Sequence, residues 1–172
     1  SSNNYFLYNL PGKFKFYNTI YNEVYVNENG YITFGIGESA FVQNLLQNHF
    51  SRNRISGLFL NLLKNTEGTT STGWEGTNSD IFIGSGRYGE IVITYQNYIH
   101  NPATVNYRVD FQIRLFLSPT TDPNNLYSDD NFKEGTIQVS YNNNTGMDNL
   151  SPIVGLSNGL GYDSSTFNEL YF

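Results

Sequence analysis

The chain has 172 residues and a formal net charge of -6; 14% of the residues are charged, 16% are aromatic and none is cysteine. The lack of cysteine excludes disulfides and thiolate chemistry, and nine scattered Lys and Arg residues argue against a nucleic-acid partner. No apolar run approaches the roughly 20 residues of a membrane-spanning helix. The length predicts that residues 1–172 form one domain, and the aromatic and β-branched composition predicts that it is rich in β-strands.

The first predicted element is a hairpin, in which two alternating apolar runs flank the pair Asn29-Gly30. A two-residue turn at this pair would place the apolar side chains of the two runs on opposite faces. A three-residue loop of residues 28–30 pairs Val26 with Ile32 instead, and it brings all the apolar side chains to one face. Such loops close with a left-handed residue, which Gly30 can supply. We therefore predict the three-residue loop, with Gly30 at positive φ.

Two glycine motifs match the pattern of a dinucleotide-binding loop: residues 35–40 read G-x-G-x-x-A and residues 84–89 read G-x-G-x-x-G. That chemistry needs a helix after the glycines, so that the helix N-terminus meets the phosphates. A strand pattern follows residues 84–89, which predicts a hairpin turn there. Residues 35–40 do precede a predicted helix, Ser39 to about Asn48 with Ser39 as N-cap, but their strand belongs to the first hairpin. Neither motif is predicted to bind a nucleotide.

Later segments have strand patterns, and the clearest is residues 107–117, where apolar and polar side chains alternate. This alternation predicts one buried and one solvated face, with Asp110 on the solvated face. The other predicted strands are residues 55–63, which we interpret as a single buried strand, and residues 89–98, 136–141 and 151–159. Together the segments predict an all-β fold, an antiparallel, jelly-roll-like β-sandwich with one short helix.

Residues 14–35, FKFYNTIYNEVYVNENGYITFG, resemble the F-x-F-(F/Y)-G-x-x-Y-x-x-V-x-V-N-x-N-G-Y-I-x-F-G opening of nidogen-like (NIDO) and related extracellular β-sandwich domains. Later strand segments follow in the order of that family, although only this first block is distinctive. The chain departs from the family at Asn18, Asn61 and Tyr95, where Gly, Asp and Trp are usual. A role that depends on the Asp carboxylate is therefore not carried over.

The resemblance implies a non-catalytic domain of a surface or matrix protein, and it has no catalytic residues to transfer. We expect an extracellular, cell-surface or virion-surface location, and the lack of cysteine favours a microbial or viral protein. A start without Met or a signal peptide is expected of a mature or excised segment. The expected work of the domain is adhesion, assembly or presentation of neighbouring domains, with other surface proteins or a second copy as partners.

One loop of the chain, residues 120–135, groups oxygen ligands of the kind that calcium prefers. The candidate calcium ligands are Asp122, Asn124, Asp129, Asp130 and Glu134. Their spacing does not fit the EF-hand frame, and the alternative is a solvated acidic loop between two strands.

The alternative function is a carbohydrate-binding module, because aromatic stacking and amide hydrogen bonds commonly hold sugars. The single tryptophan, Trp74, lies in a Gly/Thr/Ser-rich loop, and Trp74, Glu75 and Asn78 are the candidate ligand-binding residues. The other interpretation is that Trp74 caps one end of the core. No G-x-S-x-G elbow is present, and His49 and His100 have no serine or carboxylate at a telling spacing, so an enzyme is not predicted.

Overall fold

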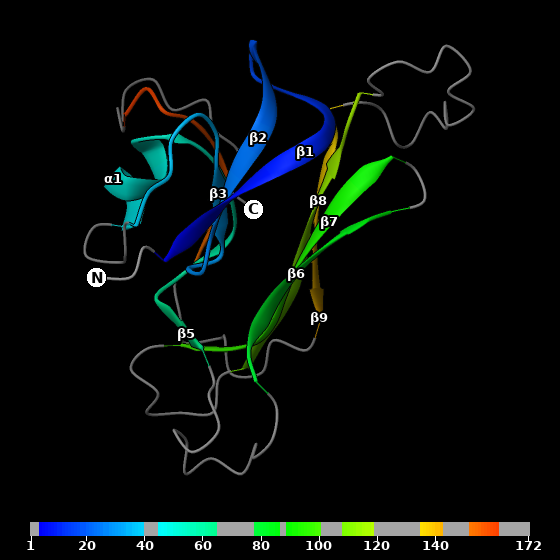
Figure 1. Ribbon diagram of the computed structural model, residues 1–172. Helices are drawn as coiled ribbons and strands as arrows, with labels where there is room; N and C mark the ends of the chain where they lie inside the picture. The colour runs from blue at the N-terminus through cyan, green and yellow to red at the C-terminus, as the bar shows by residue number, and fades with distance from the viewer. Residues whose placement is uncertain are drawn as a thin grey trace.

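The computed structural model describes residues 4–39, 45–64, 78–86, 89–100, 108–118, 135–142 and 152–161, which form two antiparallel sheets and one short helix. The elements are β1 Tyr5–Phe16, β2 Thr19–Asn27, β3 Tyr31–Thr33, α1 Leu45–Phe50, β4 Asn53–Phe59, β5 Leu62–Lys64, β6 Asp80–Ser85, β7 Glu90–His100, β8 Arg108–Phe116, β9 Ile137–Asn142 and β10 Ile153–Asn158. Sheet 1 has the order β1-β2-β3-β4-β10, and sheet 2 has the order β5-β7-β8-β9 with β6 also paired to β7. Figure 1 shows the sheets as two layers, with α1 on the side of sheet 1 away from sheet 2. The predicted antiparallel β-sandwich with one short helix is confirmed.

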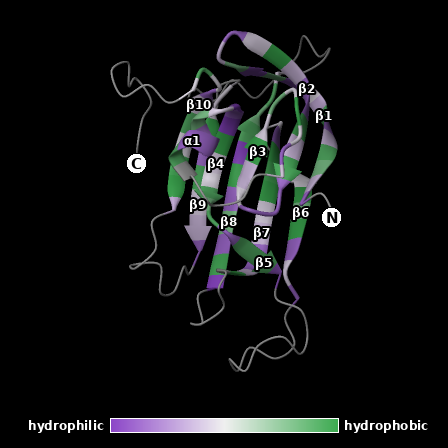
Figure 2. Ribbon diagram, turned by 90° about the vertical axis from the view of Figure 1, so that its left-hand side faces the viewer, coloured by the Kyte–Doolittle hydropathy of each residue, from purple (hydrophilic) through white to green (hydrophobic). Residues whose placement is uncertain are grey.

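The hydrophobic core lies between the two sheets, because alternate residues of each strand face inward. The predicted apolar face of β8 is buried throughout: Val109, Phe111, Ile113 and Leu115. From sheet 1 the core receives stacked phenylalanines, with ring centroids 5.7 Å apart for Phe14 and Phe34 and 4.5 Å apart for Phe16 and Phe34. Figure 2 shows the hydrophobic and hydrophilic bands that alternate along the strands.

The first hairpin has the predicted register. Val26 lies opposite Ile32, and both side chains are fully buried on the inner face of sheet 1. Gly30 has a φ of 82°, in the left-handed region. Both observations confirm the three-residue loop.

Residues 55–63 are not one strand, which corrects the prediction. In sheet 1, β4 ends at Phe59, and β5 begins at Leu62 in sheet 2, so the chain changes sheets between them. Leu60, within this crossing, is only 3% exposed. The run is largely apolar because β4, Leu60 of the crossing and Leu62 of β5 are buried, so its composition carries no sign of the break.

The glycines of residues 84–89 lie at a hairpin turn, as predicted. Ser85 at the end of β6 lies opposite Ile91 of β7, and the Gly86 N–H donates to the Glu90 carbonyl at 2.7 Å. The helix α1 covers the C-terminal part of the predicted helix and extends to Phe50. Residues 40–44, the earlier part of that prediction, lie outside the described residues.

Candidate functional site

Most of the predicted binding residues lie outside the part of the chain that the structure describes. They are Trp74, Glu75, Asp122, Asn124, Asp129, Asp130 and Glu134. Asn78 is described and is exposed, two residues before β6. Its carbonyl accepts a hydrogen bond from Asn97 Nδ2 at 3.3 Å. The structure therefore places one of the three glycan candidates at the surface beside the start of β6.

The Asn29-Gly30 turn is buried, although hairpin turns usually face solvent. Asn29 is 2% exposed; its Oδ1 accepts from the Leu62 N–H at 3.2 Å and its carbonyl accepts from the Leu60 N–H at 3.2 Å. The Gly30 carbonyl accepts from the Leu58 N–H at 2.9 Å. The turn therefore holds the segment in which the chain passes from sheet 1 to sheet 2. This role is structural, as predicted for these two residues, but its partners are distant in sequence.

Tyr95 ties the same hairpin to sheet 2. Its hydroxyl donates towards the carbonyls of Asn27 and Tyr31, at 2.9 and 3.2 Å, and its ring stacks on Phe111 at a centroid distance of 4.4 Å. Burial raises the pKa of Tyr95 well above its usual range, so the phenol stays neutral and remains a donor. Tyr95 therefore links the two sheets through the core.

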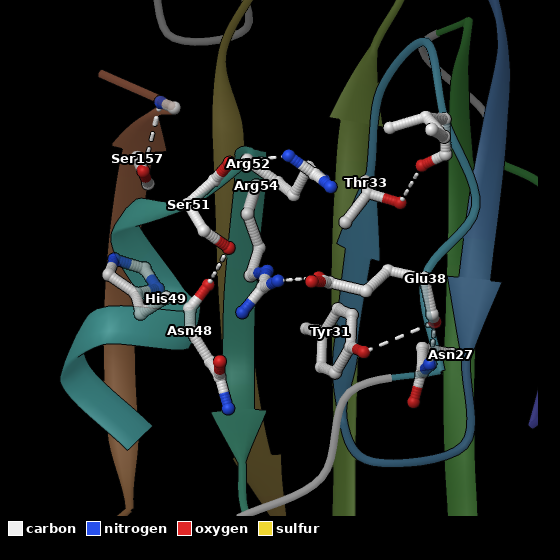
Figure 3. A network of polar contacts seen from close by, with 12 residues as sticks. Asn27, Tyr31, Thr33, Glu38, Asn48, His49, Ser51, Arg52, Arg54 and Ser157 are labelled. Atoms are coloured by element: carbon white, nitrogen blue, oxygen red, sulfur yellow. Dashed lines mark hydrogen bonds and ion pairs between the residues drawn. The ribbon is translucent and has the colours of Figure 1, made fainter. Parts of the chain in front are cut away.

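A buried polar cluster lies on the face of sheet 1 that points away from sheet 2. We call it the Arg54 cluster; its members are Asn27, Tyr31, Glu38, Arg54 and Phe59. Arg54 Nη2 pairs with Glu38 Oε2, as Figure 3 shows, and the guanidinium lies 4.4 Å from the ring centroid of Tyr31 and 4.9 Å from that of Phe59. The side chain of Arg54 is 0% exposed and that of Glu38 is 17% exposed.

The cluster fastens the segment after β3 onto sheet 1. The Glu38 carbonyl accepts from Asn27 Nδ2 at 2.6 Å and from the Tyr31 hydroxyl at 3.3 Å. Two residues before Glu38, the Ile36 carbonyl accepts a hydrogen bond from the Thr33 hydroxyl at 2.7 Å. Side chains of β2 and β3 donate hydrogen bonds to backbone carbonyls of this segment. The segment therefore covers the outer face of the first hairpin.

Arg54 has a structural role rather than a ligand-binding one. Burial lowers the pKa of its guanidinium to about 10, so the side chain is still a cation at neutral pH. Nε and Nη1 of Arg54 have no hydrogen-bond partner among the described residues. The ion pair with Glu38 and the two aromatic rings are therefore the main interactions that stabilise the buried charge. Because the side chain is fully buried, it does not reach a ligand at the surface. The sequence signal for this buried cluster is the arginine directly before the apolar run of β4.

His49 and Ser56 form a second buried polar pair, which joins α1 to β4 and β10. His49 Nδ1 lies 2.8 Å from Ser56 Oγ, and Nε2 lies 3.3 Å from the Leu156 carbonyl. A carbonyl only accepts, so Nε2 carries the proton and Nδ1 accepts from the serine hydroxyl. The orienting group is thus a carbonyl rather than a carboxylate, and Ser56 is 1% exposed. This pair holds α1 on the sheet.

Acid is expected to destabilise the protein through His49. Burial lowers the pKa of His49 from 6.5 to about 4, so between these values the unfolded chain binds a proton that the folded chain does not. The free energy of unfolding should therefore fall by up to about 3 kcal/mol as the pH falls through this window. The check is urea unfolding of the wild type and His49→Gln at about pH 7 and about pH 4. The fall in the free energy of unfolding between the two pH values should be smaller in His49→Gln than in the wild type by this amount. Equal losses in the two proteins would contradict the assignment.

Asp110 is buried, which corrects the prediction of a solvated side chain. It is 7% exposed; Oδ1 accepts from the Asn97 N–H at 2.7 Å, and Oδ2 lies 2.7 Å from Arg108 Nε. Asn97 has a φ of 60° and lies where the register of β7 and β8 shifts, between Tyr95 and Tyr98. The carboxylate therefore satisfies a backbone donor that the shift removes from the regular ladder. The alternating pattern of β8 contains no information about this irregularity in its neighbour.

The outer face of sheet 2 carries polar side chains in rows across the strands. One row runs from Phe82 on β6 through Thr94 and Gln112 to Ser140 on β9. Gln112 Nε2 donates to the Thr94 hydroxyl at 3.0 Å, and Arg114 Nη2 donates to Gln112 Oε1 at 3.3 Å. Phe82, at the end of the row, is 52% exposed. This face therefore presents amides and hydroxyls beside an exposed aromatic ring.

Within the described ranges, no three His, Asp or Glu side chains gather where they could hold a metal ion. None of the helical residues described here belongs to a helix long and apolar enough to span a bilayer. Comparisons with known protein families, with curated proteins and with solved structures find no match to this chain.

Proposed function

We propose that this domain is a non-catalytic interaction module of a surface protein, and that it serves adhesion, assembly or the presentation of neighbouring domains. The observation that carries the proposal is which polar side chains are buried and which apolar side chains are exposed in the described residues. The reactive polar groups Arg54, His49 and Asp110 are buried and hold the fold together. Large apolar side chains, in contrast, lie exposed on strands at the edges of the sandwich, among them Leu7 and Phe82.

Exposed apolar side chains that gather in a contiguous patch mark surfaces that contact another macromolecule. Leu7 on β1 is 47% exposed, and Phe82 on β6 is 52% exposed. Both strands are at the edge of a sheet, where backbone groups also remain available for pairing. The resemblance of residues 14–35 to nidogen-like domains supports the same role, and it supports an extracellular, cell-surface or virion-surface location.

A second candidate function is carbohydrate binding, and the outer face of sheet 2 is the observation that favours it. Thr94, Gln112 and Ser140 lie in one row beside the exposed ring of Phe82. Amide and hydroxyl groups both donate and accept hydrogen bonds, which matches the hydroxyls of a sugar. Asn78 is exposed close to the start of β6, and the loop that carries Trp74 and Glu75 immediately precedes it in the sequence.

One pair of measurements separates the two candidates. The domain is screened against a glycan array, and its self-association is measured in parallel by sedimentation velocity. Concentration-dependent assembly without glycan binding is the expected result for the interaction module. Glycan binding that Trp74→Ala or Gln112→Ala abolishes would establish the carbohydrate-binding function instead. A monomer that binds no glycan would contradict both self-assembly and carbohydrate binding by this domain.

A further inference from the structure

We infer that β6 is a docking edge for a second copy of this chain, and that two β6 strands pair antiparallel across a two-fold axis. This inference rests on the proposed assembly function and specifies its partner. Sheet 2 would then continue from one copy into the other, with the outer faces of both sheets on the same side.

The edge of β6 is open within the described residues. β7 lies between β6 and β8, and β6 has no strand on its other side among the residues that the structure describes. Ile81 and Ile83 pack partly against the core, whereas Phe82 points outward and is 52% exposed. A sheet edge with apolar side chains and free backbone groups is a template for pairing with another strand.

The other edges of the sandwich each differ from β6 in the side chains that they present. On β1, Pro11 and two lysines interrupt the edge, and Lys13 exchanges backbone hydrogen bonds with Ser118 at 3.3 and 2.8 Å. On β9, the Tyr141 hydroxyl reaches across to the Gly57 carbonyl of sheet 1 at 2.5 Å. On β10, no large apolar side chain is exposed. Like β9 and β10, β6 contains neither Lys, Arg nor Pro, the residues that commonly block edge pairing, and it also presents the exposed ring of Phe82.

The side chains of β6 are complementary to themselves in one register. Residues opposite each other in an antiparallel pair point to the same face, so a two-fold axis that keeps both outer faces together must pass through a residue. With the axis at Phe82, the two Phe82 rings meet on the outer face and Ile81 meets Ile83 on the inner face. Asp80 then lies opposite Gly84, which has no side chain that could repel the carboxylate.

Shifting the axis breaks this match. An axis at Ile83 would set Phe82 against Gly84, and an axis at Ile81 would set Phe82 against Asp80. Only the axis at Phe82 pairs apolar side chains at all three central positions. It also separates the two Asp80 carboxylates by about 13 Å along the strands, beyond the Debye length of about 8 Å at physiological ionic strength. A second copy is therefore the occupant that fits this edge despite the net charge of -6 on each chain.

Disulfide trapping tests the register, because the chain contains no cysteine of its own. Phe82→Cys should form a covalent dimer under mild oxidation with diamide, since opposed Cα atoms lie about 4.5–5.5 Å apart, within the range of a disulfide. Gly84→Cys should not, because its two thiols would be about 13 Å apart along the strands. A mixture of Gly84→Cys and size-tagged Asp80→Cys should form the mixed dimer. A Phe82→Cys protein that stays monomeric, or Gly84→Cys that links as readily, would overturn the register.

Sedimentation velocity tests the edge itself without cross-linking. Phe82→Lys places two cations against each other at the axis, and it should weaken self-association at least about tenfold. Ile20→Lys on β2 is the matched control, with the wild-type side chain 63% exposed, and it should associate like the wild type. Melting temperatures close to that of the wild type would show that both variants are folded.

The outcomes also separate this inference from the proposed function. If the wild type associates and Phe82→Lys associates equally well, the docking edge is wrong and the assembly function stands. A wild type that stays monomeric up to its highest soluble concentration would overturn the inference and the assembly function together. Loss of association in Phe82→Lys alone, together with the Phe82→Cys cross-link, is the result that we expect.

Discussion

Replacing Gly30 with alanine is expected to lower the free energy of unfolding by about 4 kcal/mol. Gly30 has a φ of 82°, a conformation that costs a residue with a Cβ about 1–2 kcal/mol. A Cβ at this position would also lie 2.1 Å from the Leu58 carbonyl oxygen and 2.9 Å from its carbon. Relieving that overlap moves the turn away from β4 and weakens the hydrogen bonds that Gly57 and Leu58 donate to the Gly30 carbonyl.

Two other glycines separate the steric and conformational contributions. At Gly89 φ is 75° but a Cβ would meet nothing within 4 Å, so Gly89→Ala should cost only about 1 kcal/mol. At Gly84 a Cβ also has open space within 4 Å, so Gly84→Ala should change stability by less than about 0.5 kcal/mol. Urea unfolding of the three variants checks the order. A Gly30→Ala protein no less stable than Gly89→Ala would contradict the buried turn.

Neutralising Glu38 should be almost as damaging, because it leaves a buried cation without a counterion. We expect Glu38→Gln to lower the free energy of unfolding by about 3 kcal/mol. Arg54→Met should cost less: the aliphatic side chain still packs on the rings of Tyr31 and Phe59, and the Glu38 side chain, 17% exposed, can turn to water.

The double variant provides the decisive measurement for this pair. In Glu38→Gln/Arg54→Met no charge remains buried, so its loss of stability should be smaller than the sum of the two single losses by about 2 kcal/mol. Denaturant unfolding of all four proteins gives the coupling free energy directly. Additive losses would show that the ion pair does not account for the stability of the Arg54 cluster.

The first hairpin could be predicted because its determinants are local. Strand side chains alternate with a period of two, so only one loop length places Val26 and Ile32 on the same face. The left-handed residue that this loop needs is Gly30, within the loop itself. The hairpin at residues 84–89 was equally local, because the strand that follows its glycines excludes the helix of a dinucleotide site.

The division of residues 55–63 between β4 and β5 could not be predicted in the same way. Apolar character indicates that a segment is buried, but not against which layer each part of it packs. The chain changes sheets where Asn29 accepts hydrogen bonds from the N–H groups of Leu60 and Leu62, roughly thirty residues away in sequence. This contact exists only after the sheets have come together.

The buried polar residues show the same limit. His49, Arg54 and Asp110 resemble ordinary solvated side chains in the sequence, because each has a partner from another part of the chain that the sequence pattern does not reveal. For Asp110 the partner is a backbone N–H in the neighbouring strand, which is free only because the register shifts there.

The sequence by itself therefore determined the fold class, the first hairpin with its register, and the inner face of β8. All of these depend on the period of a strand and on the conformational freedom of glycine, which act over a few residues. Tertiary structure alone decided where the chain changes sheets, which polar groups are buried, and which strands lie at the edges of the sheets. Those features depend on contacts between distant segments, and such contacts form only when two layers pack face to face.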